Sequence, residues 1–207
     1  MLGLRPHVVI LAAGASRRFG SPKTLARLGG ETLLARAVRL ASAHVGDSFT
    51  VILGENAAEL RRSHALDPAR CRSVAADPHS GLSASLRTAI DSLPPETLGA
   101  MVLLVDQPGI AIADLDRLTQ AWQVAPDKVV AARYAQTIGA PCILPRRLFG
   151  PAMALTGDQG ARNLLRRETD VIAIDLPLAA LDVDTVGDLA LAAATLGESQ
   201  TNGDPTG

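Results

Sequence analysis

Aromatic side chains are scarce in this sequence of 207 residues, which has three phenylalanines, one tryptophan and one tyrosine. Proteins that bind single-stranded nucleic acid stack successive bases on aromatic side chains, so the composition argues against that class. Cysteine is also rare, and the two present, Cys71 and Cys142, are too few for the disulfide framework of a small secreted domain. We therefore expect an aliphatic core, reduced thiols and a cytoplasmic protein.

Long apolar runs and an excess of one charge are absent as well. No stretch approaches the roughly 20 apolar residues of a membrane span, and residues 1–7 lack the apolar stretch of a signal peptide. The 20 basic residues stand against 21 acidic ones, and the net charge of −1 argues against a general nucleic-acid binder. We expect neither a membrane nor a nucleic acid among the partners.

The length fits one domain that can bury most of its apolar surface without a structural metal. We predict that this domain covers residues 1–196. Residues 197–207 are rich in Gly, Ser, Thr, Asn, Asp and Pro, a composition that predicts a disordered tail.

Short apolar runs alternate with segments of helical periodicity along the chain. Strands are predicted at residues 7–11, 50–53, 73–76, 101–105, 129–132, 142–144 and 171–174. Helices are predicted at residues 31–43, 56–64, 82–93, 113–124, 159–167 and 186–196. This alternation indicates an α/β fold with a mostly parallel sheet and helices on both faces. Between Val129 and Leu144 no helix fits, so an antiparallel hairpin is expected there.

Ligands bind outside the carboxyl ends of the strands in such sheets, which directs attention to the residues after Leu11, Ala76, Val105 and Ile174. After Leu11, the small residues at positions 12–14 let a backbone approach a bulky ligand, and exposed amides can bind phosphate oxygens. Arg18 and Lys23 add fixed positive charge. A solvated Gly-Ala turn is the simpler alternative, but the position after the first strand favours phosphate binding. The segment is neither a Walker loop nor a dinucleotide G-x-G-x-x-G motif.

Three aspartates follow later strands. Asp106 comes directly after a buried strand, where a carboxylate can hold Mg²⁺, although it could also cap a helix or order the turn at Pro108. Asp182 and Asp184 stand at alternating positions, so in an extended chain their side chains point in opposite directions. One of them could join Asp106 at a metal while the other caps the helix that begins at residue 186.

Two further segments carry weaker signals. In residues 77–86, Ser83 and Ser85 put hydroxyls at a helix start after the flexible Gly81, and His79 is either a general base or an exposed loop histidine. Residues 157–162 resemble another helix start, with Asp158 as a possible cap and Arg162 one turn inside. Neither segment suggests a function by itself.

Taken together, these segments resemble the molybdenum cofactor cytidylyltransferase family, part of the nucleotidyltransferase superfamily with a Rossmann-like fold. From Leu11 to Lys23 the chain matches every specified position of the superfamily pattern L-A-A-G-x-S-x-R-(M/F)-G-x-P-K. The narrower resemblance extends from about Val8 to Leu191. It rests on Asp106-Gln107-Pro108, on residues 81–86 and 157–162, and on Gly139 with Pro141.

The resemblance implies a role for each matching residue. The nucleotide would be held by Leu11, Ala12, Ala13, Gly14, Arg18, Lys23, Gly81, Ser83, Ser85 and Asp106. Among these, Lys23, Arg18 and Asp106 would be catalytic, and Asp106 with Asp184 would bind Mg²⁺. The acceptor would contact Gly139, Pro141, Asp158 and Arg162. Ala13, where guanylyl-transferring relatives have a glycine, resembles the CTP-using branch.

The implied reaction moves CMP from CTP onto the terminal phosphate of molybdenum-bound molybdopterin and releases pyrophosphate. A recipient molybdoenzyme or its chaperone would be a further partner. Three alternatives stay open: the same chemistry with GTP or another phosphorylated acceptor, a non-catalytic nucleotide- or cofactor-binding chaperone, and a metabolite-binding regulator. The sequence departs from the family in a shorter loop between Asp77 and Gly81, and in Ala89 where many members have glycine.

Overall fold

The computed structural model describes residues 4–14, 16, 18–54, 57–62, 66, 72–76 and 81–197. Its strands are β1 (His7–Ala12), β2 (Arg27–Leu28), β3 (Glu31–Thr32), β4 (Phe49–Leu53), β5 (Arg72–Ala75), β6 (Gly99–Leu104), β7 (Val129–Tyr134), β8 (Thr137–Pro145) and β9 (Val171–Asp175). Its α-helices are α1 (Leu33–Val45), α2 (Ala57–Arg62), α3 (Gly81–Asp91), α4 (Ile112–Val124), α5 (Phe149–Met153), α6 (Ala161–Leu165) and α7 (Val186–Leu196). Short 3-10 helices lie at η1 (Lys23–Leu25), η3 (Arg146–Leu148) and η4 (Pro177–Ala180).

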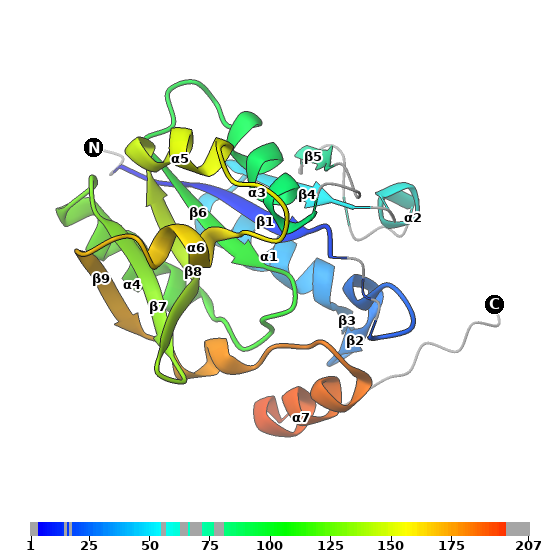
Figure 1. The fold of residues 1–207 in the computed structure, drawn as a ribbon. Coiled ribbons are helices and arrows are strands. Elements are labelled where there is room, and N and C mark those ends of the chain that lie inside the picture. Colours follow the sequence, from blue (N-terminus) through cyan, green and yellow to red (C-terminus); the bar gives the residue numbers. More distant parts are fainter. Residues whose placement is uncertain are drawn as a thin grey trace.

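Seven strands form the main sheet in the order β5-β4-β1-β6-β8-β7-β9. The strands β5, β4, β1 and β6 are parallel, β8 is antiparallel to both β6 and β7, and β9 is parallel to β7. Figure 1 shows this sheet running through the molecule between two layers of helices. The predicted mostly parallel α/β sheet with an antiparallel hairpin is confirmed.

Alternation along the central strand explains why both faces of the sheet are covered. On β1, Val8 and Ile10 belong to the core cluster that contains residues of α1, α4 and α7. Val9 between them belongs to the second cluster, with residues of α3, α5 and α6. Successive strand side chains point to opposite faces, so a run of fully buried apolar residues needs a helical layer on each side.

The predicted element boundaries differ from the structure in several places. The helix predicted at residues 159–167 is the shorter α6, because Gly160 is its N-cap and the backbone of residues 157–159 forms a turn before it. The strand predicted at residues 142–144 extends back to Thr137, and the ribbon of β2 and β3 was not predicted because two-residue strands show no alternation. In the described ranges, no helix is both long and apolar enough to span a bilayer.

The topology brings three loops to one edge of the sheet. Leu11 of β1 pairs with Ile52 of β4 on one side and with Leu104 of β6 on the other, and both pairs of strands are parallel. The segments that follow β1, β4 and β6 therefore leave the sheet at the same end, which we call the carboxyl edge. The opposite end, where these strands begin, is called the amino edge.

Candidate active site

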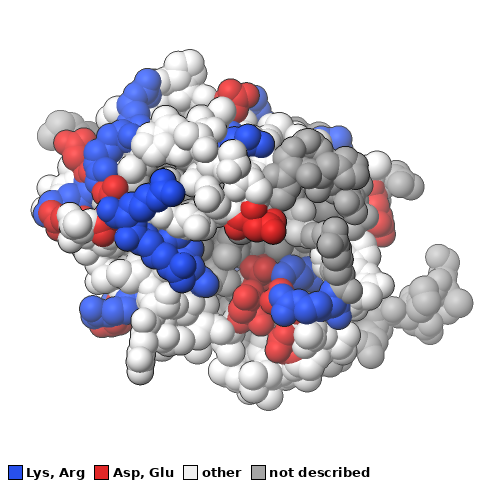
Figure 2. All heavy atoms as spheres, viewed as in Figure 1, with Lys and Arg blue, Asp and Glu red and all other residues white. Residues whose placement is uncertain are grey.

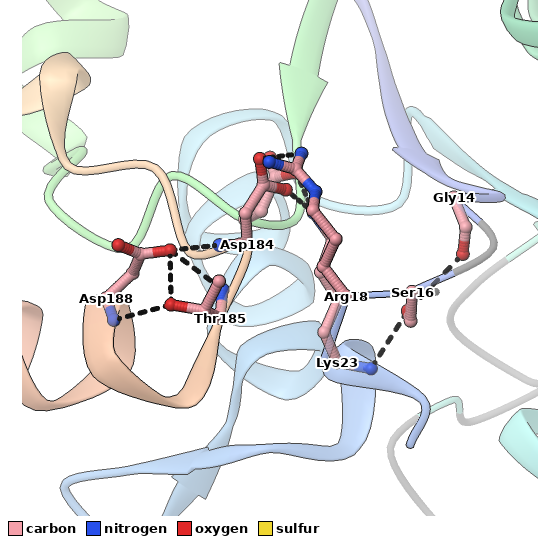
Figure 3. Close-up of polar contacts among 8 residues, drawn as sticks. Gly14, Ser16, Arg18, Lys23, Asp184, Thr185 and Asp188 are labelled. Carbon is pink, nitrogen blue, oxygen red and sulfur yellow. Dashed lines mark hydrogen bonds and ion pairs between the residues drawn. The ribbon is translucent and has the colours of Figure 1, made fainter. Parts of the chain in front are cut away.

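The loop after β1 is closed by Ser16, which sequence reasoning did not single out. Its hydroxyl donates a hydrogen bond to the Gly14 carbonyl at 3.4 Å and accepts one from the Lys23 backbone N–H at 3.0 Å (Figure 3). Ser16 has a φ of +49°, a left-handed conformation in which the chain turns back on itself. This turn brings Lys23, eleven residues after β1 ends at Ala12, back to the carboxyl edge.

Close packing holds the backbone of this loop in place. A Cβ atom at Gly54, just after β4, would lie 2.6 Å from the Ala13 carbonyl oxygen, so only glycine fits there. By contrast, among the described residues a Cβ at Gly14 would meet only the Lys23 side chain, at 4.0 Å. The predicted nucleotide-binding stretch from Leu11 to Gly14 is thus packed against the residue that follows β4 at Ala13, and is less crowded by described residues at Gly14.

The ammonium group of Lys23 lies between two carboxylates. Its Nζ donates to Asp106 Oδ2 at 2.5 Å and to Asp184 Oδ1 at 2.9 Å. Its side chain is only 10% exposed. Burial opposes the charged form, but attraction and hydrogen bonds from the two carboxylates outweigh burial and raise the pKa of Lys23. Lys23 is therefore charged at neutral pH, as a phosphate-binding role requires.

Arg18 reaches the same cluster from the solvent side. Its guanidinium forms an ion pair with Asp184 Oδ2 while its side chain stays 72% exposed (Figure 3). The hydrogen bond from Lys23, supported by the charges of Lys23 and Arg18, holds the pKa of Asp184 below its usual value. Both predicted phosphate-binding cations thus meet a predicted metal-binding aspartate.

The direction of the Asp182 side chain differs from the one expected for an extended chain. Asp106, Asp182 and Asp184 each offer a carboxylate oxygen, and these oxygens lie within 4.8 Å of one another, so Asp182 does not point away from the pair. The expected alternation fails because the segment is not a regular strand: η4 precedes it, and the Asp182 N–H donates to the Ala180 carbonyl in a tight turn. Partial burial, followed by repulsion from Asp106 and Asp184, raises the pKa of Asp182 to about 6.

The capping alternatives for these aspartates were wrong. Thr185 is the N-cap of α7, and Asp188 Oδ2 accepts hydrogen bonds from the backbone N–H groups of Thr185, at 2.7 Å, and Asp184, at 3.1 Å (Figure 3). The spacing T-x-x-D could have revealed this capping box. Asp106 does not cap α4 either, since the Ala111 N–H bonds to Asp114. The carboxylates of Asp106 and Asp184 therefore cap no helix, and both bond to Lys23 in the cluster.

The two carboxylate oxygens of Asp106 differ in their hydrogen bonding. Its Oδ2 bonds to Lys23, but Oδ1 is buried and has no hydrogen-bond partner in the part of the chain that the structure describes. A buried acceptor without a partner is costly, and such groups in native structures often mark a catalytic role or a missing ion. Three carboxylates with one free buried oxygen form the hard donor set that Mg²⁺ and Mn²⁺ prefer, so these residues fit a divalent cation.

A pocket of about 340 Å³ opens beside this cluster. Its walls include Leu11 and Leu104 at the strand ends, and Gly139, Asp158 and Arg162 from the segments predicted to face the acceptor. Figure 2 shows acidic and basic side chains gathered in the middle of this face of the molecule. Asp158 is not the cap of α6, because Asn163 Oδ1 accepts the hydrogen bond of the Gly160 N–H. Its side chain is left to the pocket.

Other predicted residues lie elsewhere. Ser83 and Ser85, in the first turns of α3, are buried at 0% and 7% exposure and do not line the pocket. Pro141 follows Ala140 through a cis peptide bond and is not a lining residue. Cys142 is fully buried and burial raises its pKa to about 12, so it is not a reactive thiol. Asp77, His79 and Cys71 lie outside the described residues.

Two residues of this region had no predicted role. Tyr134 lines the pocket. Its hydroxyl explains why residue 139 is a glycine, since a Cβ atom at Gly139 would lie 2.4 Å from that hydroxyl oxygen. Gln107 is buried beside Asp106 and donates hydrogen bonds to two carbonyl groups. The chain offers no local signal for either contact, because each joins residues that are far apart in the sequence.

Comparison with known proteins assigns the family. The family model described as the MobA-like NTP transferase domain matches residues 8–194. The chain belongs to this family. It is therefore a nucleotidyltransferase. Its cluster of a lysine, an arginine and three aspartates lies at the carboxyl edge of the sheet.

Individual relatives carry different names. The nicotine blue oxidoreductase of Paenarthrobacter nicotinovorans is 32% identical over 191 residues, covering 86% of this chain and 91% of that protein. A probable molybdenum cofactor guanylyltransferase of Synechococcus elongatus is 30% identical over 185 residues, covering 84% of this chain and 89% of its own. The solved structure of Rv0371c from Mycobacterium tuberculosis matches with a TM-score of 0.80 at 29% identity, over 92% of this chain and 99% of that one. Rv0371c has also been solved in complex with manganese, and that structure matches with a TM-score of 0.76 at 28% identity, over 91% of this chain and 97% of that one.

Proposed function

We propose that this nucleotidyltransferase moves CMP from CTP onto the terminal phosphate of molybdenum-bound molybdopterin, in a reaction that depends on Mg²⁺. The observation that carries the proposal is the meeting of Lys23 and Arg18 with three carboxylates beside a pocket of about 340 Å³. Cations suited to a triphosphate and acids suited to a divalent metal are what such a transfer needs in one place.

The chemistry needs little from a general base. A phosphate monoester has a second pKa near 6, so the attacking group is mostly dianionic at neutral pH. One of its oxygens would form a bond to the α-phosphorus of CTP, while the bond from that phosphorus to the bridging oxygen of the β-phosphate breaks. Pyrophosphate would leave with that electron pair.

The task of the chain is to bring two anions together. Lys23 and Arg18 would move from the carboxylates to the phosphates of the nucleotide, where their charges offset the charge that develops on the leaving group. Asp106, Asp182 and Asp184 would hold Mg²⁺, which supplies positive charge to the phosphates when it is bound. The manganese complex of Rv0371c supports a divalent cation in a relative of this chain.

Preference for CTP over GTP rests on Ala13. Gly54 packs against the Ala13 backbone, so the chain cannot retreat from a bulky base at this point. The methyl group of Ala13 would crowd a purine more than a pyrimidine. GTP is the alternative, because the Synechococcus relative is named a guanylyltransferase.

The acceptor is proposed to enter the pocket lined by Gly139, Asp158 and Arg162. The apolar walls suit a flat ring system, and Arg162 makes no ion pair with any described residue, which leaves its charge for an anionic acceptor. A molybdopterin carries both features. The name of the Synechococcus relative supports the molybdenum cofactor as the acceptor class.

A panel of nucleotides tests the proposal. Pyrophosphate release is measured with CTP, GTP, ATP and UTP, each with and without molybdenum-bound molybdopterin and with Mg²⁺ present or chelated. Release that needs CTP, acceptor and Mg²⁺ together is the expected result. Release with another nucleotide or acceptor would move the assignment within the same chemistry. No release with any combination would favour a binding protein, or the oxidoreductase activity named in the Paenarthrobacter relative.

A further inference from the structure

Gln107 is a buried polar side chain to which the proposed reaction gives no role. It is 7% exposed and directly follows Asp106. Its Nε2 donates to the Ala179 carbonyl at 2.8 Å and to the Ala140 carbonyl at 3.1 Å. Since both acceptors are carbonyl oxygens, the amide nitrogen must face them. Its Oε1 faces away from them, buried and without a partner among the described residues.

The first hydrogen bond reaches the segment that carries two of the acids. Ala179 lies in η4, three residues before Asp182. The same two segments meet twice more: the Val183 N–H donates to the Asp106 carbonyl at 2.9 Å, and a Cβ at Gly109 would lie 2.5 Å from the Leu178 carbonyl oxygen. The turn after β6 is therefore docked along the chain from Leu178 to Val183, and Gln107 supplies the side-chain link.

The second hydrogen bond reaches the wall of the pocket. Ala140 of β8 lines the pocket, and the Gln107 Nε2 also lies 3.4 Å from the Tyr134 hydroxyl, which crosses the same wall. One amide thus connects the segment of Asp182 and Asp184 with the wall where the acceptor is proposed to bind.

Such a link matters once the cations leave the carboxylates. Without a nucleotide, Lys23 bridges Asp106 and Asp184, but in the proposed reaction it moves to the phosphates. Repulsion among the carboxylates would then push apart two segments that are about 80 residues distant in sequence unless other contacts hold them. An amide can do this without adding charge to the cluster. Removing it would take a donor away from two buried carbonyl groups, which is more costly than losing an exposed hydrogen bond.

We propose that Gln107 is a positioning residue that holds Asp182 and Asp184 within reach of Asp106 and sets the distance between this cluster and the pocket wall. The inference rests on the proposed metal-dependent transfer. Through its two hydrogen bonds Gln107 acts on metal affinity and on the acceptor, without touching the nucleotide cradle after β1.

The test compares Mn²⁺ binding to nucleotide-free wild type, Gln107→Met and Arg146→Met by titration calorimetry. Methionine keeps the length of the side chain but has no donor. Arg146 is the matched control, because its guanidinium also donates to two carbonyls, those of Pro95 and Thr97, but at the amino edge. We expect Gln107→Met to bind Mn²⁺ about 10- to 100-fold more weakly, as for other residues that orient metal ligands, and Arg146→Met to bind like wild type.

Two further measurements separate positioning from a general loss of stability. Hydrogen exchange of the Val183 amide should speed up in Gln107→Met more than exchange of core amides such as that of Val9, since only the docking contact loosens. In turnover assays the KM for the acceptor and the Mg²⁺ requirement should rise while the KM for the nucleotide stays close to wild type. If the methionine variant does not fold, Gln107→Asn keeps an amide that is too short to reach both carbonyls and should also weaken Mn²⁺ binding.

Wild-type affinity for Mn²⁺ in a folded Gln107→Met or Gln107→Asn would overturn the inference while leaving the proposed function intact. An equal loss in Arg146→Met would also overturn it, because the effect would then be one of stability alone. A wild-type protein that neither binds Mn²⁺ nor releases pyrophosphate would instead remove the proposed function on which the inference rests.

Discussion

The two edges of the sheet treat their polar side chains in opposite ways. At the amino edge, the His44 ring bonds to Asp116 at 2.9 Å and to Thr119 at 3.0 Å, and Arg146 bonds to two backbone carbonyls. At the carboxyl edge, three carboxylates crowd together and two consecutive residues, Asp106 and Gln107, each keep a buried oxygen without a described partner.

The difference matches the proposed function, in which the polar groups of the amino edge serve the fold and those of the carboxyl edge serve a ligand. Paired groups such as those of His44 add stability because each donor has found its acceptor. Unpaired oxygens and like charges at close range cost stability and persist where a ligand repays them. Substitutions at the carboxyl edge should therefore change activity more than stability, and substitutions at the amino edge should do the reverse.

The largest effect is expected for the two cations. Arg18→Ala and Lys23→Ala should each lower kcat by ~10²–10³-fold, because one charge that stabilises the transition state is lost. Arg18 is mostly exposed, so its loss should change the free energy of unfolding by no more than about 0.5 kcal/mol. Pyrophosphate release and chemical denaturation measure the two quantities. Near-normal release from both variants would remove the phosphate-binding assignment.

The next largest effect is expected for the three acids of the cluster. Asp106→Asn, Asp184→Asn and Asp182→Asn should each raise the Mg²⁺ concentration that gives half-maximal activity, since all three carboxylates meet. The extended-chain interpretation had made Asp182 a bystander. Asp116→Asn, on the exposed side of α4, is the matched control and should leave the Mg²⁺ requirement unchanged. An Asp182→Asn enzyme with the wild-type requirement would return Asp182 to that bystander role.

The next effect in size should be the one on nucleotide preference. We expect kcat/KM for CTP to exceed that for GTP by about 10- to 200-fold, the discrimination that a methyl-sized difference can provide. Ala13→Gly should narrow this ratio by improving GTP. The measurement is side-by-side kcat/KM for both nucleotides in both proteins. A wild-type preference for GTP would contradict the role of Ala13 and leave nucleotidyl transfer standing.

Asp182 should also affect the stability of the metal-free protein. Its pKa is raised in the fold to about 6, so its contribution to stability is present at low pH and is lost as pH rises through about 6. Asp182→Asn should therefore raise the Tm in the presence of a chelator at pH 8 and change it little at pH 4. Thermal scans at these two values are the check, and a Tm gain that is equal at both would speak against the crowding of the acids.

The smallest effect is expected at the amino edge. Burial lowers the pKa of His44 despite the attraction of Asp116, so the fold favours the neutral ring. Its contribution to stability is present above a pH of about 6.5 and is lost as pH falls through the lowered folded pKa. His44→Gln should thus lose less Tm than wild type between pH 7.5 and 5, with nearly unchanged kcat. A steeper loss in the variant would show that protonated His44 is stabilised by Asp116.

Much of this protein follows from local sequence. The buried run from Val8 to Ile10 sets a central strand, because residues apolar on both faces need a covering layer on each side. The loop from Leu11 to Lys23 is contiguous, so its small residues and its cations can be recognised without knowing what lies opposite. The range of α7 was also predicted correctly, from its helical periodicity.

The acid cluster and the pocket belong to the tertiary structure. The predicted direction of the Asp182 side chain was wrong, because alternation holds only in a regular strand. The segment instead turns after η4 and packs against Asp106, a contact that the local sequence does not indicate. The contacts of Gln107 and Tyr134 were not predicted for a similar reason. They join these side chains to carbonyls and a glycine that lie on other parts of the chain. Sequence by itself determined which segments carry charge and which are buried, because both are properties of neighbouring residues. Tertiary structure alone decided which charges meet, because that depends on the distance between segments that the chain keeps far apart.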